Sequence, residues 1–355
     1  MKEAQPTRII VLRSGAVGDC ILSTPALSAL RRAYPSAHLT LLGDPFSADL
    51  FKGSPDIDRL IKLDPKVMRR REYLTALLRL RRERFSLLVD LHGNSRTFLQ
   101  TLLIGGKRRL GFETRHSRSI VYTHRAPYRM DVHTVFRQLE LLRPIGVTID
   151  PSNPTETSLC VTISESERRE ARALLDAAGL PIGHPYAVLH PGAGAGLRLK
   201  QWRPDRFAAV AVRIQESLGL EMVVTGSGEG ERPVVEQVMA AARRPMISLF
   251  NKTGLRTLAA VLEGAALYVG CDTGPMHLSA ALGTPVVALF GPTDPVRWSP
   301  WSPTPWRVIR AGLPCSPCPG KICPYNVECM SSLEVDQVFE AAQELCRAPS
   351  SQQKV

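Results

Sequence analysis

Short apolar runs alternate with helix-like stretches along most of the chain, and this alternation constrains the fold more than any other feature. In the first half, apolar runs at 8–12, 38–43, 59–63 and 87–91 are separated by stretches of helical periodicity such as 70–84. Buried strands joined by helices form a parallel sheet that is covered on both faces. The sequence therefore predicts an α/β fold.

The same alternation restarts in the second half of the chain. The stretch 143–157 is rich in Pro, Thr and Ser and lacks helical periodicity, so we place the linker there. A chain of 355 residues is long enough for two cores. We therefore expect two Rossmann-like domains, 1–155 and 156–355, with a C-terminal helix near 333–346 that can pack back on the first domain. The following strands are expected in the second domain: 186–190, 221–226, 246–250, 267–270 and 285–290.

Ligands of such domains bind at the carboxyl ends of the strands. We expect the two domains to face each other across a cleft, in which a bound ligand can be shielded from water. The loops that follow the strands are therefore the places to look for chemistry.

The net charge of +12 comes entirely from the first half. Residues 1–150 contain 5 Lys and 21 Arg against 14 acidic residues, whereas residues 151–355 contain 19 basic and 19 acidic residues. This asymmetry favours an anionic partner, such as a nucleic acid, an anionic membrane surface or a phosphorylated substrate. The alternative is that the arginines line solvated helix faces. No apolar run approaches the ~18 residues of a membrane span, and the first residues lack a signal-peptide core, so we expect a cytoplasmic protein.

The loop 13–19 joins the first expected strand to the first helix. Gly15 and Gly18 allow backbone amides to approach an anion at the N-terminus of that helix. The spacing is not that of a dinucleotide-binding loop, which disfavours a dehydrogenase. Asp19 has two interpretations: it caps the helix, or it is a carboxylate available as a general base.

Two loops of the second half combine glycines with charged or hydroxyl side chains. The loop 190–196 has alternate glycines and precedes Lys200, which can bring a positive charge to a phosphate, although the loop can also be merely flexible. In the loop 270–274, Thr273 and Gly274 precede a helix and can present a hydroxyl and amides to an anion, while Asp272 can accept sugar hydroxyls. Both loops therefore predict an anion site.

A third loop, 225–231, places carboxylates just after an expected strand. Such carboxylates commonly bind ribose hydroxyls. Glu229 and Glu231 both fit, and the sequence does not choose between them.

Taken together, the motifs resemble those of glycosyltransferase family 9, the lipopolysaccharide core heptosyltransferases, over nearly the whole chain. The motifs are Gly-Asp at 18–19 with Thr-Pro-Ala-Leu at 24–27, His-Pro-Gly at 190–192 with Lys200 and Trp202, Asp-Thr-Gly-Pro-Met-His at 272–277, and Phe-Gly-Pro-Thr-Asp-Pro at 290–295. The resemblance implies a GT-B fold, an ADP-heptose donor and an inverting transfer onto the lipopolysaccharide inner core, with neither a cofactor nor a catalytic metal.

The resemblance also implies roles for single residues. Asp19 becomes the general base and Lys200 a contact to the donor phosphate or sugar. Asp272 is expected to contact the heptose, and Thr273 and Gly274 are expected to contact the diphosphate. The further candidates are Glu229 on the ribose and His277 for the donor, and Ser14, Gly15, His92, Asn94, Arg96, Arg115 and Arg118 for the acceptor.

One segment, 90–97, departs from the family pattern. The family commonly has Gln and Lys where this chain has His92 and Arg96, which leaves the acceptor roles of these two residues open.

The expected acceptor is a phosphorylated glycolipid, so an enzyme of this kind is expected as a peripheral protein at the inner face of the cytoplasmic membrane. The basic residues of its first half are then candidates to contact the acceptor or anionic lipid. One alternative is a GT-B enzyme with another nucleotide sugar. A nucleic-acid-binding protein is disfavoured because the basic half lacks stacking aromatics and a known DNA-binding motif, so no nucleic-acid partner is expected. The candidate basic contacts are Lys66, Arg69 to Arg71, Lys107 to Arg109, Arg115 and Arg118.

Four of the eight cysteines cluster near the C-terminus, with a spacing that resembles a metal knuckle. The alternatives are a structural zinc or iron–sulfur site and reduced structural cysteines, and we favour the second. The four are Cys315, Cys318, Cys323 and Cys329.

Overall fold

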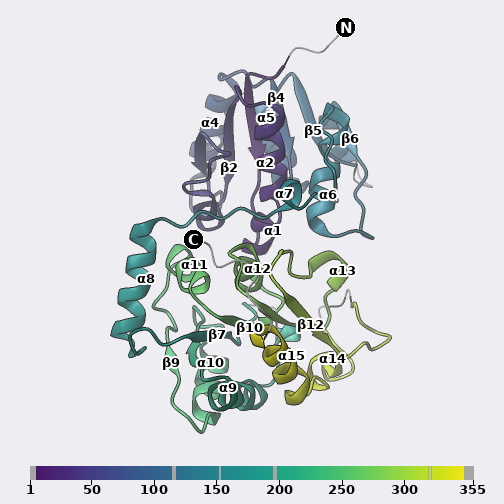
Figure 1. Ribbon diagram of the computed structural model, residues 1–355. Coiled ribbons are helices and arrows are strands. Elements are labelled where there is room, and N and C mark those ends of the chain that lie inside the picture. Colours follow the sequence, from purple (N-terminus) through teal and green to yellow (C-terminus); the bar gives the residue numbers. More distant parts are fainter. Residues whose placement is uncertain are drawn as a thin grey trace. The chain divides into compact units, whose positions relative to one another are not determined.

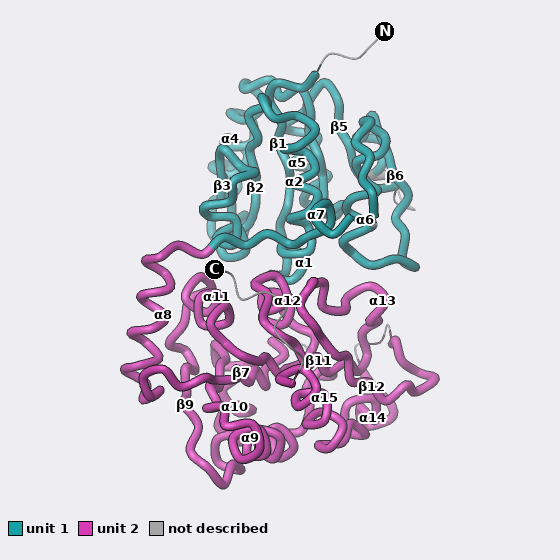
Figure 2. The backbone as a smooth tube through the Cα atoms, in the orientation of Figure 1, with its two compact units in different colours: residues 1–162 teal, residues 163–355 magenta. Residues whose placement is uncertain are grey.

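The computed structural model describes residues 5–113, 117–151, 153–194, 198–318, 320 and 322–347. The chain divides into two units, 1–162 and 163–355 (Figure 2). The division falls later in the chain than the predicted boundary at residue 155. Each unit is described below by itself.

Unit 1 is built on a six-stranded sheet in which all pairs are parallel, in the order β3-β2-β1-β4-β5-β6. Figure 1 labels β2, β4, β5 and β6 of this sheet. The central strand is buried because residues 9–12 are all apolar. The sequence did not predict β5 and β6, whose charged residues and glycine interrupt any apolar run. The strands are β1 (Arg8–Leu12), β2 (His38–Gly43), β3 (Arg59–Lys62), β4 (Leu87–Asp90), β5 (Arg108–Phe112) and β6 (His124–Ala126).

Helices pack in pairs in unit 1, α4 with α5 and α2 with α6. Tyr73, Leu77 and Leu80 of α4 pack on Ile10 and Leu88 of the central strands. Three 3₁₀ turns complete the unit: η1 (Asp49–Phe51), η2 (Ser117–Val121) and η3 (Arg143–Ile145). The helices are α1 (Val17–Ile21), α2 (Thr24–Ala33), α3 (Pro45–Ala48), α4 (Arg70–Arg81), α5 (Ser95–Ile104), α6 (Thr134–Glu140) and α7 (Pro154–Thr157).

The stretch 19–34 has helical periodicity in the sequence but is not one helix, because the chain breaks between α1 and α2. Pro25 has no N–H to donate to the preceding turn. The hydroxyl groups of Ser23 and Thr24 instead donate to the carbonyls of Cys20 (2.7 Å) and Ile21 (2.8 Å). The short first helix therefore ends close to Asp19.

Unit 2 repeats the architecture, with a parallel sheet in the order β12-β11-β10-β7-β8-β9. The fully buried strands β7 and β10 lie at its centre. The strands are β7 (Tyr186–His190), β8 (Glu221–Val224), β9 (Ile247–Ser248), β10 (Leu267–Cys271), β11 (Val286–Phe290) and β12 (Trp306–Arg310). The helices are α8 (Glu165–Ala177), α9 (Pro204–Leu218), α10 (Arg232–Ala241), α11 (Leu255–Glu263), α12 (Gly274–Ala281), α13 (Pro295–Trp298), α14 (Glu328–Ser331) and α15 (Val335–Arg347), with a 3₁₀ turn η4 (Arg198–Lys200).

The C-terminal helix α15 belongs to the core of unit 2. Its apolar side chains, among them Val338 and Ala342, share a cluster with Phe207 of α9. The indole of Trp202 donates to the Leu333 carbonyl at 3.1 Å, just before the helix. No described helix of either unit has both the length and the apolar composition needed to cross a membrane.

A capping box formed by Ser164 and Glu167 begins α8. The Ser164 hydroxyl accepts from the Glu167 amide, and the Glu167 carboxylate accepts from the Ser164 amide at 2.8 Å. Arg256 of α11 also donates to this carboxylate through two nitrogens, each at 2.8 Å. This pairing with Arg256 lowers the pKa of Glu167 to about 2, so one carboxylate both caps α8 and ties it to α11.

We expect Glu167→Gln to destabilise the protein by about 2 kcal/mol at pH 7, because hydrogen bonds to a charged group are lost. The folded-state pKa of Glu167 lies below its usual value of 4.5, so its contribution is complete above pH 4.5 and is lost as the pH falls toward 2. Urea unfolding at pH 7 and pH 3 measures both effects, and the difference from wild type should shrink at pH 3. Glu165→Gln on the same helix, where the carboxylate is exposed, is the control and should change little. An equal loss at both pH values would contradict this account.

Candidate functional site

The carboxyl ends of β1, β2 and β4 bring three distant segments of unit 1 together. Asp44, directly after β2, accepts from the Gly15 amide at 2.9 Å. The same carboxylate pairs with both terminal nitrogens of Arg96, at 2.7 and 3.1 Å. The loop after β1 is thereby fastened to the start of α5. The sequence analysis missed Asp44, although its place just after an expected strand is the signal that could have found it.

Asp19 does not cap α1, so the structural interpretation of this residue is not supported. The N-cap position is Ala16, and no side chain caps the helix. The Asp19 carboxylate instead lies 3.0 Å from Nη2 of Arg13, whose side chain is only 2% exposed against 30% for Asp19. Nη1 of Arg13 donates to the Leu91 carbonyl at 3.0 Å. A buried arginine therefore holds a partly exposed carboxylate.

The His92 ring packs against Gly15, whose φ of +110° favours glycine. A Cβ atom at position 15 would lie 2.7 Å from the ring, so the loop and the ring fit closely. Burial, with the nearby charge of Arg13, lowers the pKa of His92, which is therefore neutral at pH 7. Its amide and that of Gly93 donate to buried Asp90, each at 2.9 Å.

The other acceptor candidates have different surroundings. Asn94 is the N-cap of α5 and accepts from the Thr97 amide at 2.9 Å, so its side chain has a structural task. Ser14 is buried at the end of β1. Arg115 lies outside the described residues, as does the side chain of Arg118. The structure thus brings Ser14, Gly15, His92 and Arg96 together with Asp19, whereas Arg115 and Arg118 are not placed.

In unit 2, Lys200 and Asp272 form an ion pair at the carboxyl end of β10. The Lys200 ammonium donates to Oδ2 of Asp272 at 2.7 Å and to its backbone carbonyl at 3.3 Å. The other carboxylate oxygen lies 3.6 Å from Nε2 of His277, on α12. Burial alone would raise the pKa of Asp272, but the nearby His277 ring and the charge of Lys200 lower it to about 2. Asp272 is thus ionised and holds Lys200 in place.

The N-terminus of α12 follows this ion pair directly. Thr273 is the N-cap, but its hydroxyl donates to the Cys271 carbonyl at 3.2 Å and caps no amide of the helix. Gly274 begins the helix, and Pro275 has no amide to satisfy. The first turn therefore offers amides and the positive end of a helix dipole beside Lys200, which suits an anion.

The structure distinguishes the two glutamates of the loop after β8. Glu229 is 78% exposed and pairs with Arg232 at 2.8 Å. Glu231 is 9% exposed and accepts from the amides of Gly194 (2.8 Å) and Ser227 (2.9 Å). Burial raises the pKa of Glu231, but the neighbouring His190 and the two amides bring it down to about 2. Glu231 thus fastens two glycine-rich loops together, while Glu229 projects from the turn.

The four clustered cysteines are all free thiols. The sulfur of Cys318 accepts from the Gly320 amide at 3.3 Å, and that of Cys323 from the Val327 amide at 3.3 Å. Burial and the neighbouring thiols raise the pKa of Cys329. Within the described residues, no three Cys, His, Asp or Glu side chains are arranged to hold a metal ion.

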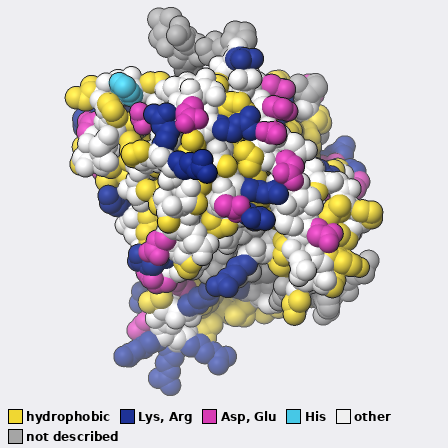
Figure 3. Space-filling view, turned by 90° about the horizontal axis from the view of Figure 1, so that it is seen from below, with side chains coloured by type: hydrophobic (Ala, Val, Ile, Leu, Met, Phe, Trp, Pro, Cys, Tyr) yellow, Lys and Arg dark blue, Asp and Glu magenta, His cyan; other side chains and the backbone are white. Residues whose placement is uncertain are grey.

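The basic residues of unit 1 fall into two groups. Arg109 is used internally, because it donates to the carbonyls of Val121 (2.6 Å) and Gly106 (2.8 Å). Lys66 and Arg69 to Arg71 are exposed. The face drawn in Figure 3 carries acidic side chains among the basic ones.

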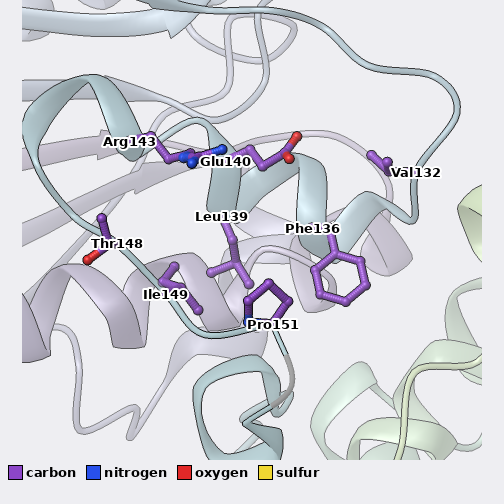
Figure 4. A pocket seen from close by; sticks show the side chains of 8 residues that line it. All are labelled: Val132, Phe136, Leu139, Glu140, Arg143, Thr148, Ile149 and Pro151. Atoms are coloured by element: carbon purple, nitrogen blue, oxygen red, sulfur yellow. The ribbon is translucent and has the colours of Figure 1, made fainter.

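A pocket of about 310 Å³ lies elsewhere in unit 1, between α6 and the segment that follows it (Figure 4). Apolar side chains dominate its wall, and none of the predicted site residues lines it. The sequence analysis placed only a linker in this region. The lining residues are Val132, Phe136, Leu139, Glu140, Arg143, Thr148, Ile149 and Pro151.

Comparison with known proteins decides the family. Residues 75–327 match the model of glycosyltransferase family 9 (heptosyltransferase). The chain belongs to this family. It is 29% identical to lipopolysaccharide heptosyltransferase 3 of Escherichia coli (strain K12), over 80% of this chain and 83% of that protein. The family resemblance inferred from the motifs is thereby confirmed.

Solved structures agree with the fold. The glycosyltransferase family 9 protein of Veillonella parvula DSM 2008 superposes with a TM-score of 0.81 at 27% identity, covering 96% of this chain and 97% of that one. E. coli heptosyltransferase WaaC with ADP-2-deoxy-2-fluoro heptose gives a TM-score of 0.69 at 20% identity, covering 95% and 99%. The predicted GT-B class, with two Rossmann-like α/β domains, is confirmed.

We expect Glu231→Gln to destabilise unit 2 by about 2 kcal/mol, because the amides of Gly194 and Ser227 lose a charged acceptor. Glu229→Gln is the matched control, since Glu229 is solvated and should contribute almost nothing. Denaturant unfolding of the two variants measures the difference. Equal stabilities would contradict the role assigned to Glu231.

Proposed function

We propose that this protein transfers heptose from ADP-heptose to the inner core of lipopolysaccharide, with inversion at the anomeric carbon. Family membership supports the reaction type. The names of the relatives support the substrates, since one is a lipopolysaccharide heptosyltransferase and WaaC was solved with an ADP-heptose analogue. The observation that carries the proposal is the fixed Lys200 cation beside the uncapped N-terminus of α12.

The donor diphosphate fits this arrangement. Lys200 is oriented by Asp272 before any ligand binds, so little reorganisation is needed when negative charge develops on the departing ADP. The amides of the first turn of α12, beginning at Gly274, supply further stabilisation, and the Thr273 hydroxyl is close by. The exposed carboxylate of Glu229 pairs with Arg232 and can exchange this surface partner for ribose hydroxyls, whereas the carboxylate of Glu231 is held by two loop amides. Asp272 then acts chiefly by holding Lys200, with His277 behind it.

The acceptor reaction uses the carboxylate of Asp19. In the proposed step, the acceptor hydroxyl gives its proton to Asp19 as its oxygen bonds to the anomeric carbon from the face opposite the diphosphate. The bond between that carbon and the diphosphate oxygen breaks, and its electron pair leaves with ADP. One displacement of this kind inverts the configuration and requires no covalent enzyme intermediate.

We also propose that the enzyme works at the cytoplasmic face of the inner membrane, where the acceptor lies. The exposed Lys66 and Arg69 to Arg71 of unit 1 support this location, because they have the charge to contact acceptor phosphates or anionic lipid. Arg96 and Arg109 contribute less, since both are engaged in internal contacts.

Asp19→Asn tests the base. The amide keeps the shape of the side chain but cannot take the proton, so we expect kcat to fall about 10²- to 10⁴-fold while ADP-heptose affinity is unchanged. ADP release in the presence of acceptor measures the first quantity, and calorimetry the second. Asp49→Asn, which removes an exposed carboxylate paired with Lys62, is the control and should leave turnover intact. Near-normal turnover of Asp19→Asn would refute the assignment.

Lys200→Met tests the donor site. Loss of the charge should weaken the binding of both ADP and ADP-heptose about 10- to 100-fold, which corresponds to the 1.5–3 kcal/mol typical of charged hydrogen bonds. Calorimetry with each ligand measures this change. Lys252→Met, at an exposed position of the same unit, is the control. Unchanged affinity for both ligands would place the diphosphate elsewhere.

A further inference from the structure

Arg13 is a buried cation that the sequence motifs did not single out. Its backbone amide donates to the Leu42 carbonyl at 2.9 Å, which continues the pairing of β1 with β2. Its side chain reaches the other neighbour of β1, since Nη1 donates to the carbonyl of Leu91, just after β4. The guanidinium is thus fixed by the sheet itself, with Nη2 3.0 Å from Oδ1 of Asp19.

The two oxygens of the Asp19 carboxylate are therefore not equivalent. Oδ1 lies 3.0 Å from Nη2 of Arg13 in an ion pair, and no other ion pair of the Asp19 side chain exists within the described part of the chain. The side chain is 30% exposed, which leaves it accessible to a ligand. An arginine suits this task better than a lysine, since its planar fork can bond to two fixed acceptors in different directions.

Arg13 is the charged group that acts on Asp19, because the other ionisable groups nearby are neutral or already bonded to other residues. His92 is held neutral, because burial and Arg13 both lower its pKa. Cys20 is protonated, because burial raises its pKa. The carboxylate of Asp44 accepts hydrogen bonds from Arg96 and from the Gly15 amide. The carboxylate of Asp90 accepts from the amides of residues 92 and 93.

We propose that Arg13 is a positioning residue for the transfer, which fixes Oδ1 of Asp19 so that Oδ2 receives the acceptor proton. This inference rests on the proposed function. When the proton arrives on Oδ2, Asp19 becomes neutral and the buried Arg13 loses its counterion. Arg13 therefore also favours release of the proton and return of the carboxylate after ADP and product leave.

The test uses Arg13→Lys and Arg13→Gln of the full chain, with kcat and KM measured across pH. We expect kcat to fall about 10- to 100-fold in both variants, because orientation is lost, with little change in KM for ADP-heptose. Arg13→Gln removes both the charge and the planar fork, so its kcat should fall at least as far as that of Arg13→Lys.

Arg137→Lys is the matched control for loss of a buried arginine. Arg137 is also in unit 1 and is 3% exposed, but it contacts Thr134 and stacks on Tyr128. Its variant should keep the wild-type profile. Thermal melts establish that each variant folds. If Arg13→Gln does not fold, the kcat of Arg13→Lys alone tests the role of Arg13.

Three outcomes distinguish this inference from the function on which it rests. If Asp19→Asn is inactive but folded Arg13 variants keep the wild-type kcat, only the role of Arg13 is overturned. If Asp19→Asn is active, the base and the role of Arg13 both fail. If the wild-type protein transfers no heptose, the proposed function fails first.

Discussion

Parallel strands place all their carboxyl ends at one edge of a sheet, and charged residues from distant parts of the chain must be neutralised there. Each unit meets this constraint with an ion pair between a buried partner and a more exposed one. Arg13 is buried and Asp19 partly exposed, while Asp272 is buried and Lys200 is the more exposed member. A buried charge is costly unless it is bonded further. Arg13 also donates to the Leu91 carbonyl, and Asp272 also lies beside His277. In each pair the buried residue is therefore fixed, and it orients its more exposed partner, which stays accessible to a ligand.

The candidate residues fall into two groups, according to whether their polar atoms are already bonded within the protein or are open to solvent. Asn94, Arg96 and Glu231 are engaged in caps, ion pairs and loop contacts, so their contribution is to hold the loops. Asp19 and Glu229 keep carboxylate surface open to solvent. A heptosyltransferase of this family therefore depends as much on the residues that fix its loops as on the residues that contact substrate.

The sequence predicted the central strands of both sheets because a strand buried on both faces is a continuous apolar run. It missed β5, β6 and β12, since strands with charged residues on a less buried part of a sheet lack that pattern. It also could not choose between Glu229 and Glu231, because the choice depends on Gly194, which is distant in the sequence. The position of Asp44 just after an expected strand is visible in the sequence, but its partners Gly15 and Arg96 come from two other loops and are not.

The central claim is that this protein catalyses an inverting heptosyl transfer. The most direct measurement is to incubate the full chain with ADP-heptose and a truncated inner-core glycolipid, then to analyse the glycolipid by mass spectrometry and the new linkage by NMR. The account predicts a gain of one heptosyl residue, with the anomeric configuration opposite to that of the donor. No gain from ADP-heptose, or a product that retains the donor configuration, would contradict it.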